Sequence, residues 1–223
     1  MSSYKEHTIS CPKCSASGKF TAWDSVNIDL MPQMKEKVLS GDLFRWTCPE
    51  CGEAFTVPYP MLYHDMTNKI MVYHLLQRNN PSDSNAVNLL GKTGLLSDYT
   101  LRSCYSVDDF REKVTQLDAG LDDRILEFLK YYILHFDKSN QVPEGAELRF
   151  SRAAEDKETG GIYLLFYIVH PSMPNLPFLQ VSSNAYHEIA YSDRNLDEIF
   201  GKQGSNYLEV SQFIMNKRLR GGI

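Results

Sequence analysis

The tetrapeptides CPKC at residues 11–14 and CPEC at residues 48–51 decide how this sequence of 223 residues is interpreted. Both follow the pattern Cys-Pro-x-Cys, and together they hold four of the chain's five cysteines. Zinc takes four ligands in a tetrahedron and binds thiolates at about 2.3 Å, so two such turns supply a complete ligand set. The pattern therefore predicts a zinc site with four ligands: Cys11, Cys14, Cys48 and Cys51.

The two turns differ at the residue that follows the second cysteine. Gly52 stands there in the second copy, where the backbone often needs a positive φ, whereas Ser15 stands there in the first. The proline after each first cysteine fixes φ and stiffens both turns before any metal arrives. We expect the first turn to be less regular than the second, with its two ligands intact.

The spacing between the two turns indicates a zinc ribbon with an elaborated loop. Between Cys14 and Cys48 lie 33 residues, more than in a compact site of this pattern. Doubling a flexible loop costs only roughly 0.6 kcal/mol, against about 10–16 kcal/mol of metal-binding energy in small zinc domains. Residues rich in β-formers flank both turns, as in a zinc ribbon.

Two other kinds of chemistry use cysteine pairs, and both fit less well. A thioredoxin-type redox site places one CxxC at the start of a helix near a βαβ pattern, and neither copy is followed by a convincing helix. A catalytic zinc keeps one position open for water, which four thiolates do not leave. We therefore expect a structural zinc ion, with redox chemistry and catalytic zinc as the alternatives.

Composition places the chain among ordinary globular proteins, with 43% hydrophobic and 23% charged residues. The 28 acidic and 23 basic residues give a net charge of −5, which argues mildly against nucleic-acid binding. The first ten residues lack the apolar core of a signal peptide, and no apolar run approaches ~18 residues. We expect a cytoplasmic protein, whose reduced thiols bind metal rather than form structural bridges.

Local patterns predict an α+β fold. Strands are expected at 19–28, 43–47, 54–59, 70–76, 99–105, 147–153, 161–169 and 178–182. Helices are expected between Pro32 and Gly41, at 106–117 after the N-cap Ser106, and at 122–136. Weaker helical patterns cover 184–200 and 208–219, and a helix over 62–77 is the alternative to the strand at 70–76.

The helix at 122–136 carries an apolar stripe that we expect to face a core: Ile125, Leu129, Ile133 and Phe136. With the helix before it, it forms an antiparallel hairpin. Three regions follow: a zinc-ribbon-like β region with an inserted short helix at 5–77, a strand plus the helical hairpin at 86–137, and an α+β region with an antiparallel sheet at 138–223. Residues 78–85 (RNNPSDSN) form a loop between the first two.

A few further residues suggest other chemistry. Tyr63, His64 and Asp65 stand side by side, and a His–Asp pair can do acid–base work, although no nucleophile is placed by the sequence. Packing or turn formation is the simpler interpretation of these three. His74 lies in an apolar run and is expected in a core, and Cys104, within a predicted strand, is expected to be a buried thiol.

Several segments, taken in order, resemble one known family. They are CPKC at 11–14, WDSVNI at 23–28, LFRWTCPECGEAF at 43–55, YPMLYHDM at 59–66 and DAGLDDRILEFLK at 118–130. Together they resemble the CpXC domain family of bacteria and archaea, over about the first 137 residues. The resemblance implies metal binding through the same four cysteines and implies no reaction, because the family has no established activity.

These observations lead to one expected function and two alternatives. We expect a metal-binding protein whose structural zinc stiffens a β-ribbon that presents a surface to a protein partner, with no catalytic residues. The first alternative is an enzyme or a small-ligand-binding protein with a pocket near Tyr63, His64 and Asp65. The second, less favoured because of the net charge, is a zinc ribbon that binds nucleic acid.

Overall fold

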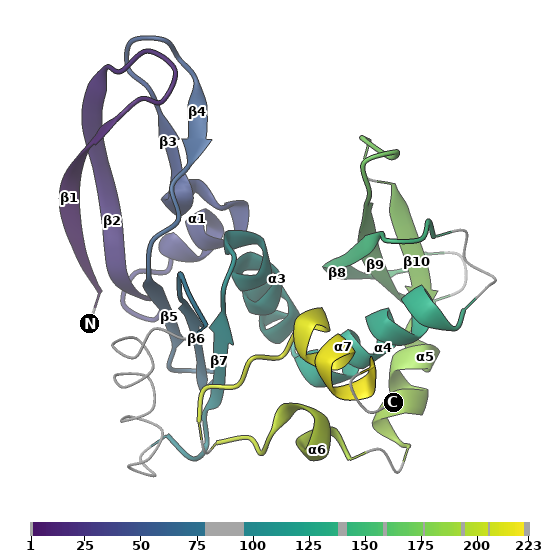
Figure 1. The fold of residues 1–223 in the computed structure, drawn as a ribbon. Helices are drawn as coiled ribbons and strands as arrows, with labels where there is room; N and C mark the ends of the chain where they lie inside the picture. The colour runs from purple at the N-terminus through teal and green to yellow at the C-terminus, as the bar shows by residue number, and fades with distance from the viewer. Residues whose placement is uncertain are drawn as a thin grey trace. The chain divides into compact units, whose positions relative to one another are not determined.

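The computed structural model describes residues 2–78, 96–137, 142–157, 160–175, 177–192, 195–204 and 206–220, which combine sheets and helices as expected (Figure 1). The expected loop at 78–85 lies outside these residues except for Arg78. Among the described helices, none is long and apolar enough to cross a membrane. The chain divides into two compact units, Met1–Arg111 with Gln203–Leu208, and Glu112–Lys202 with Glu209–Ile223. The three-region division expected from the sequence stays a prediction.

The first unit is built on a five-stranded sheet with the strand order β1-β2-β5-β6-β7. Its strands are β1 (Ser3–Ser10), β2 (Ser17–Asn27), β5 (Met61–Asp65), β6 (Ile70–His74) and β7 (Thr100–Cys104). β1 and β2 pair antiparallel, as do β5 and β6, whereas β2–β5 and β6–β7 pair in parallel. The β5–β6 hairpin shows that the helical alternative for 62–77 was wrong.

The chain between β2 and β5 forms a helix and a second hairpin. It contains α1 (Met34–Ser40), the 3₁₀ turn η1 (Asp42–Phe44), β3 (Arg45–Thr47) and β4 (Ala54–Thr56). α1 ends as predicted at Gly41, whose φ is 81°. Leu43 and Phe44 were predicted in a strand and instead lie buried in η1. The strand predicted to reach Tyr59 ends at Thr56 because Pro58 and Pro60 have no N–H for a ladder.

The core of the first unit gathers aromatic rings around His74, which is buried as predicted. Its Nδ1 lies 2.6 Å from the carbonyl oxygen of Tyr59. Phe44 and Phe110 meet its ring edge-on, with centroids 5.2 and 5.9 Å away. Burial lowers the pKa of His74, so the ring is a neutral core residue.

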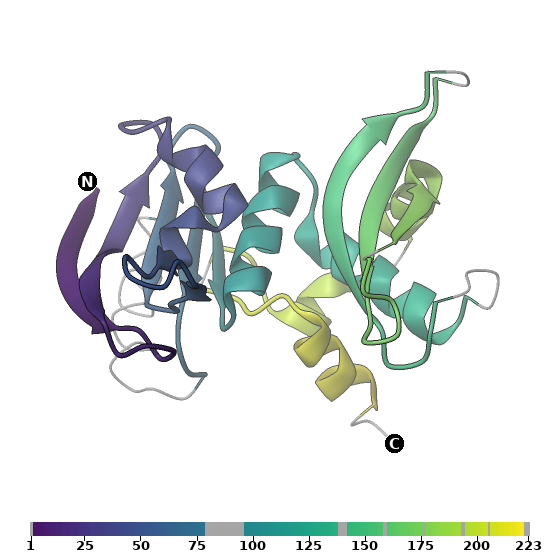
Figure 2. The ribbon, with the colours of Figure 1, turned by 90° about the horizontal axis from the view of Figure 1, so that it is seen from above.

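The second unit combines helices with a three-stranded antiparallel sheet, β10-β9-β8. Its strands are β8 (Glu147–Glu155), β9 (Ile162–Val169) and β10 (Phe178–Ser182). Its helices are the later part of α3 (Val107–Asp118), then α4 (Asp123–His135), α5 (Ser183–Ala190), α6 (Leu196–Phe200) and α7 (Gln212–Arg220). α5 lies against one face of the sheet (Figure 2). The apolar core includes Leu126, Leu129, Leu148, Phe150, Leu164 and Phe166.

The predicted N-cap Ser106 is confirmed, Asp122 proves to be the N-cap of α4 rather than its first residue, and three further details of the helices differ. Ser106 Oγ accepts the N–H of Asp109 at 3.1 Å, and Asp122 caps α4. Phe136, the last residue of the predicted stripe, is 61% exposed because it follows the final turn of α4 with φ of −126°. The helix expected at 184–200 is interrupted after Ala190, and the one expected at 208–219 begins at Gln212.

A buried ion cluster joins α3 and α4 in the second unit. Its members are Glu112, Lys113, Gln116, Asp123, Glu127 and Lys130, all less than a tenth exposed. Lys130 Nζ lies 2.8 Å from carboxylate oxygens of both Glu112 and Glu127. Lys113 Nζ lies 3.0 Å from Asp123. Charged side chains of the two helices thus pair with one another in the interior of the second unit.

Candidate metal centre

Each Cys-Pro-x-Cys sequence forms the turn of a β-hairpin. Residues 11–14 join β1 to β2, and residues 48–51 join β3 to β4. The two turns, at the ends of the purple and blue hairpins, lie side by side at the top of the first unit (Figure 1). A hairpin turn is a position that the strand pairing fixes, so the two ladders together determine where all four sulfurs lie.

The two turns share one backbone conformation. In the first, the N–H of Ser15 donates to the carbonyl oxygen of Cys11 and the N–H of Cys11 to that of Ala16, both at 2.8 Å. The second repeats the pattern, with Gly52 N–H to Cys48 at 3.0 Å and Cys48 N–H to Glu53 at 2.8 Å. Each turn is therefore closed by an equivalent pair of backbone hydrogen bonds.

Ser15 adopts the left-handed conformation that was expected only of Gly52. The φ angles are 61° at Ser15 and 71° at Gly52. The expectation that the first turn would be less regular was therefore wrong: the serine accepts the same geometry. A residue with a side chain in this region is strained by on the order of 1–3 kcal/mol, which the hydrogen bonds of the turn must offset.

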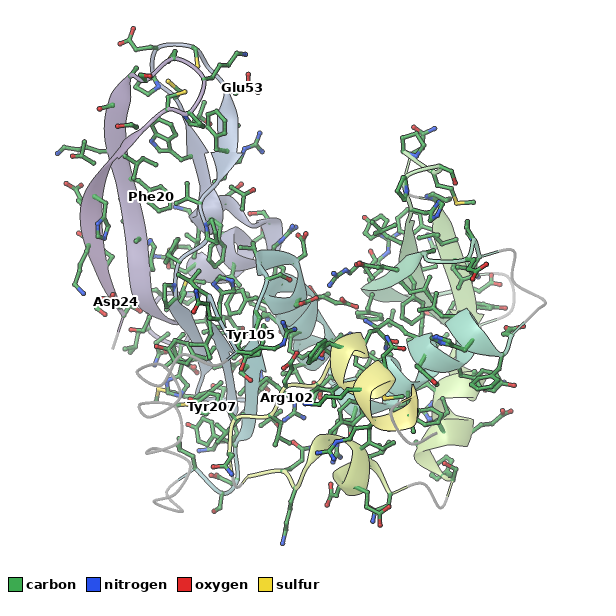
Figure 3. The ribbon with its side chains drawn as sticks, in the orientation of Figure 1. Phe20, Asp24, Glu53, Arg102, Tyr105 and Tyr207 are labelled. Carbon is green, nitrogen blue, oxygen red and sulfur yellow. The ribbon has the colours of Figure 1, made fainter. Side chains whose placement is uncertain are left out.

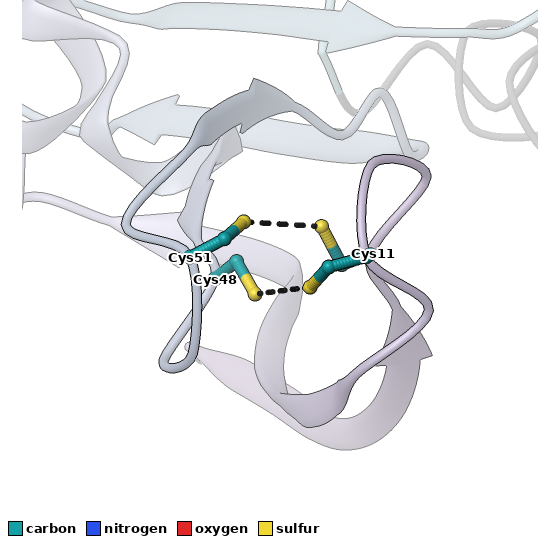
Figure 4. A group of neighbouring side chains, drawn as sticks. Cys11, Cys48 and Cys51 are labelled. Carbon is teal, nitrogen blue, oxygen red and sulfur yellow. Dashed lines mark hydrogen bonds between the residues drawn. The ribbon is translucent and has the colours of Figure 1, made fainter.

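The four sulfur atoms gather in one cluster. All lie within 4.8 Å of one another, and two contacts that join the hairpins, Cys11–Cys51 and Cys14–Cys48, are 3.6 Å long (Figure 4). Those distances exceed a disulfide bond of about 2.0 Å. Sulfurs at the corners of a tetrahedron around zinc, each about 2.3 Å from the ion, would lie roughly 3.8 Å apart. The four cysteines fit a metal ion and can hold one.

Backbone N–H groups point at the sulfurs and favour their thiolate form. The N–H of Lys13 donates to Cys11 Sγ at 3.4 Å. Ala16 and Glu53 donate in the same way to Cys14 and Cys51, two residues back. Donors of this kind stabilise negative charge on sulfur, and here they come from the turns themselves.

Crowding makes the sulfurs titrate unequally. Donation from the N–H groups of Cys51 and Glu50 outweighs desolvation and lowers the pKa of Cys48 to about 7. At Cys14 the N–H of Ala16 acts in the same direction, but desolvation and the neighbouring sulfurs outweigh it and raise the pKa to about 12. The Cys48 thiol therefore ionises readily at neutral pH and the Cys14 thiol beside it does not, and a bound cation would offset the repulsion that keeps Cys14 protonated.

Packing between the hairpins holds the two turns together. Trp46 on β3 is buried, and its Nε1 donates to the carbonyl oxygen of Lys19 on β2 at 3.1 Å. Gly18 makes this approach possible, because a Cβ there would come within 2.9 Å of the Trp46 ring. Lys13 and Glu53 form an ion pair between the turns, and Glu53 lies at the tip of its hairpin (Figure 3). The sulfurs thus meet at the end of a packed β structure.

Tyr63, His64 and Asp65 do not come together on one side of β5. Strand alternation buries Tyr63 and Asp65 on one face and leaves His64 half-buried on the other. Asp65 accepts hydrogen bonds from the N–H and the side chain of Asn68, both at 2.8 Å, which closes the β5–β6 turn. His64 Nε2 lies 3.3 Å from Tyr99 Oη. Burial of Tyr63 and the hydrogen bonds of His64 and Asp65 thus give each of the three residues a structural role.

Sequence reasoning found the four cysteines but not the residues that support them. The roles of Gly18 and Trp46 depend on the contact between two hairpins, which no local pattern reports. The N–H donors are backbone groups and leave no trace in the residue types. Cys104, the fifth cysteine, is buried on β7 as expected.

Comparison with known proteins gives one match. A family model described as CpXC protein matches residues 9–130, which include all four clustered cysteines, α3 and most of α4. No curated protein and no solved structure is significantly similar to the chain.

Proposed function

The chain belongs to the CpXC protein family, and from this premise we propose that Cys11, Cys14, Cys48 and Cys51 bind one structural zinc ion. The observation that carries the proposal is the cluster of four sulfurs within 4.8 Å. Four thiolates complete the coordination of zinc and leave no position for water, so the ion orders the protein and does no chemistry. Four cysteine sulfurs can also bind iron, but the metal that we propose is zinc.

The bound ion acts on the two hairpins of a zinc-ribbon-like structure. In small zinc domains metal binding contributes about 10–16 kcal/mol to folding, far more than one hairpin gains by pairing. β3 and β4 are only three residues long, and an isolated two-stranded hairpin is marginal in water. The ion therefore holds this short hairpin against β1–β2 and keeps the surface at the tip rigid.

We propose that this rigid end binds a protein partner in the cytoplasm and that the protein is not an enzyme. A closed metal site supports binding or assembly rather than catalysis. Toward the open end of the β1–β2 hairpin, away from the cysteine turn, Tyr4 is 59% exposed and lies against Trp23, with ring centroids 4.9 Å apart, so a partner would contact the length of this hairpin as well as its tip. Exposed aromatic residues of this kind are frequent anchors in protein interfaces. Neither alternative function gains support, because Tyr63, His64 and Asp65 do not line one site and the net charge of −5 is unfavourable for nucleic acid.

The test is the metal content of protein purified under reducing conditions without added metal, measured by mass spectrometry for zinc and iron. We expect about one zinc per chain, lost in Cys48→Ser and Cys11→Ser. The matched control is Cys104→Ala, which removes a buried cysteine outside the cluster and should keep the metal. Protein without metal, whose thiols cycle reversibly to disulfides, would overturn the structural site in favour of redox chemistry.

Partner binding is tested with the same variants. Wild-type protein and Cys104→Ala should retain the same partner when purified from source cells, and Cys48→Ser should lose it. A partner retained equally by Cys48→Ser would contradict a role for the metal centre in binding. Protein found without any partner at native abundance would contradict the interaction proposal itself.

A further inference from the structure

The edge of β7 is covered by a short segment from near the end of the chain. β7 is the last of the described strands in its sheet, and an edge strand presents N–H and C=O groups that seek partners. The N–H of Ser103 donates to the carbonyl oxygen of Leu208 at 3.0 Å, and the N–H of Leu208 donates to that of Leu101 at 3.1 Å. Leu208 thereby pairs in parallel with Arg102, as a peptide does when it adds a strand to a sheet.

Side chains of this segment, Gln203–Leu208, also fit the sheet. Tyr207 Oη donates to Met71 Sδ at 3.2 Å, and its ring lies 6.3 Å from the ring of Tyr73 on β6. Gln203 Oε1 accepts from Nη2 of the buried Arg102 at 3.0 Å. Figure 3 labels Arg102, on β7, and Tyr207, in the segment that covers the edge of this strand. Backbone pairing and three side-chain contacts together make this a specific docking site for an extended peptide.

The segment belongs to the first unit, although the chain on both sides of it, Glu112–Lys202 and Glu209–Ile223, belongs to the second. Glycines with positive φ stand just before it and within it, Gly201 at 95° and Gly204 at 76°. A Cβ at Gly204 would clash with the carbonyl oxygen of Ser97, so the site also selects a glycine. The segment is thus a short insert with one glycine just before it and another within it.

Its docking carries an energetic cost. The side-chain oxygen of Asn206 is buried and has no hydrogen-bond partner among the described residues. Among the described residues, two further buried side-chain oxygens lack a hydrogen-bond partner, and both lie on the helix that follows: Gln212 Oε1 and Asn216 Oδ1. A buried acceptor left unsatisfied costs roughly 1–3 kcal/mol, which lowers the free energy needed to release the segment.

We propose that the β7 edge is an exchangeable docking site and that the segment Gln203–Leu208 of a second copy of this chain occupies it in a reciprocal dimer. A second copy is the occupant whose fit is already established, because each copy carries the sequence that the site accepts. Exchange of an identical element between protomers creates a dimer with two-fold symmetry and no new kind of contact. This goes beyond the metal centre and does not depend on it.

The first experiment is analytical ultracentrifugation of the wild-type protein over a wide range of concentration, after long incubation. We expect a dimer that accumulates with concentration. Tyr207→Ala removes the same aromatic contact from the closed monomer and from the exchanged dimer, so it should shorten the incubation needed to reach the dimer equilibrium roughly tenfold or more. Tyr191→Ala is the matched control, because that tyrosine is 85% exposed and lies outside the segment. A wild-type protein that is monomeric at every concentration would overturn the proposal.

The second experiment uses a fluorescent peptide of the sequence QGSNYL. Leu208→Pro removes the N–H that donates to Leu101, so this variant should be monomeric and should bind the peptide. The same peptide with alanine for tyrosine should bind more weakly, and excess QGSNYL should dissociate the wild-type dimer. If Leu208→Pro binds the peptide but the wild-type protein is monomeric, the site exists and exchange between copies is overturned. A dimer that neither Tyr207→Ala nor Leu208→Pro changes would also overturn exchange.

The metal content of each variant distinguishes the two proposals. It should equal that of the wild type, because the described hydrogen bonds of the segment are to Leu101, Arg102, Ser103 and Met71, not to the four clustered cysteines. If Leu208→Pro fails to fold, Tyr207→Ala retains every backbone hydrogen bond and still tests the site. Loss of the dimer with full metal content supports exchange regardless of whether a protein partner is found for the metal centre.

Discussion

In the first unit four cysteine sulfurs gather at the ends of two hairpins, and in the second unit three acids and two lysines gather between two helices. The sulfur cluster repels itself once more than one thiol ionises, and its charge must be balanced from outside. The ion cluster contains its own cations, to which Arg149 adds a third at its rim, 3.2 Å from Glu112. If the proposed metal centre is correct, the comparison teaches that the first unit depends on the supply of metal, whereas the ion cluster of the second balances its charge with its own side chains.

Removal of the metal should produce the largest difference in stability between the two units. A strong zinc chelator should disorder the β1–β2 and β3–β4 hairpins, because metal binding of about 10–16 kcal/mol is lost there. Hydrogen exchange read peptide by peptide should rise in residues 3–56 and stay protected in α4 and β8–β10. Equal loss of protection in both units would contradict the comparison.

Breaking the ion cluster should have the next largest effect. Lys130→Met leaves Glu112 and Glu127 without their shared cation and should destabilise the second unit by about 3–5 kcal/mol in urea unfolding. Lys5→Met is the control, since its pair with Asp24 is exposed and should change stability by at most about 1 kcal/mol. If the two variants lose the same stability, the cluster is not a structural centre.

Acid should release the metal before it affects the ion cluster. Burial raises the pKa of Glu127, but Lys130 and Lys113 outweigh it and hold the pKa below the ordinary value of 4.5. The stabilisation is therefore complete above about pH 4.5 and is lost as pH falls through the lower folded pKa. Thiolate ligands compete with protons at higher pH, so a zinc-sensitive dye should report release first. NMR spectra of the second unit that change before zinc appears would contradict this order.

A methyl group at Gly18 should push the hairpins apart. Gly18→Ala places a Cβ 2.9 Å from Trp46 and 3.2 Å from Pro49, an overpacked contact that should cost about 1–3 kcal/mol and weaken metal binding. Thermal unfolding and competition with a metal dye measure both effects. Ser17→Ala, at the exposed neighbouring position, should change neither. Unaltered stability in Gly18→Ala would show that the hairpins approach less closely.

The smallest effect should come from the strained residue of the first turn. Ser15→Gly relieves a positive φ and should stabilise the protein by up to about 1 kcal/mol, since part of the gain is lost to the flexibility of glycine in the unfolded chain. The reciprocal variant Gly52→Ser should destabilise by a similar amount. Effects of the same sign in both variants would mean that the turns are not equivalent.

The sequence predicted the sulfur cluster and missed the ion cluster for one physical reason. Two short turns of identical residues gather their ligands locally, so spacing alone indicates a common centre. The ion cluster depends on which faces of α3 and α4 meet. The apolar stripe through Ile125 and Leu129 was correctly placed in a core, but no role was predicted for the polar positions Glu127 and Lys130 on the same helix. The opposite charges on the two helices were the available signal.

The same distinction explains the smaller differences. Ser15 adopts the conformation of Gly52 because the hairpin ladder and the turn hydrogen bonds outweigh its local preference. The adjacency of Tyr63 and His64 suggested a joint site, and the strand turned them to opposite faces. Local composition therefore predicted most of the elements but not the strand β1 (Ser3–Ser10), and tertiary pairing decided which side chains meet.

Within the cluster, Cys11 and Cys48 are buried whereas Cys14 and Cys51 are exposed, so each turn presents one sulfur to solvent and hides the other. An oxidant, an alkylating reagent or a competing soft metal therefore reaches one ligand from each hairpin first. Attack on these two exposed sulfurs would remove one ligand from each turn, instead of removing both ligands of a single turn. Exchange of the ion should accordingly start from the outer sulfurs while the inner two still hold it.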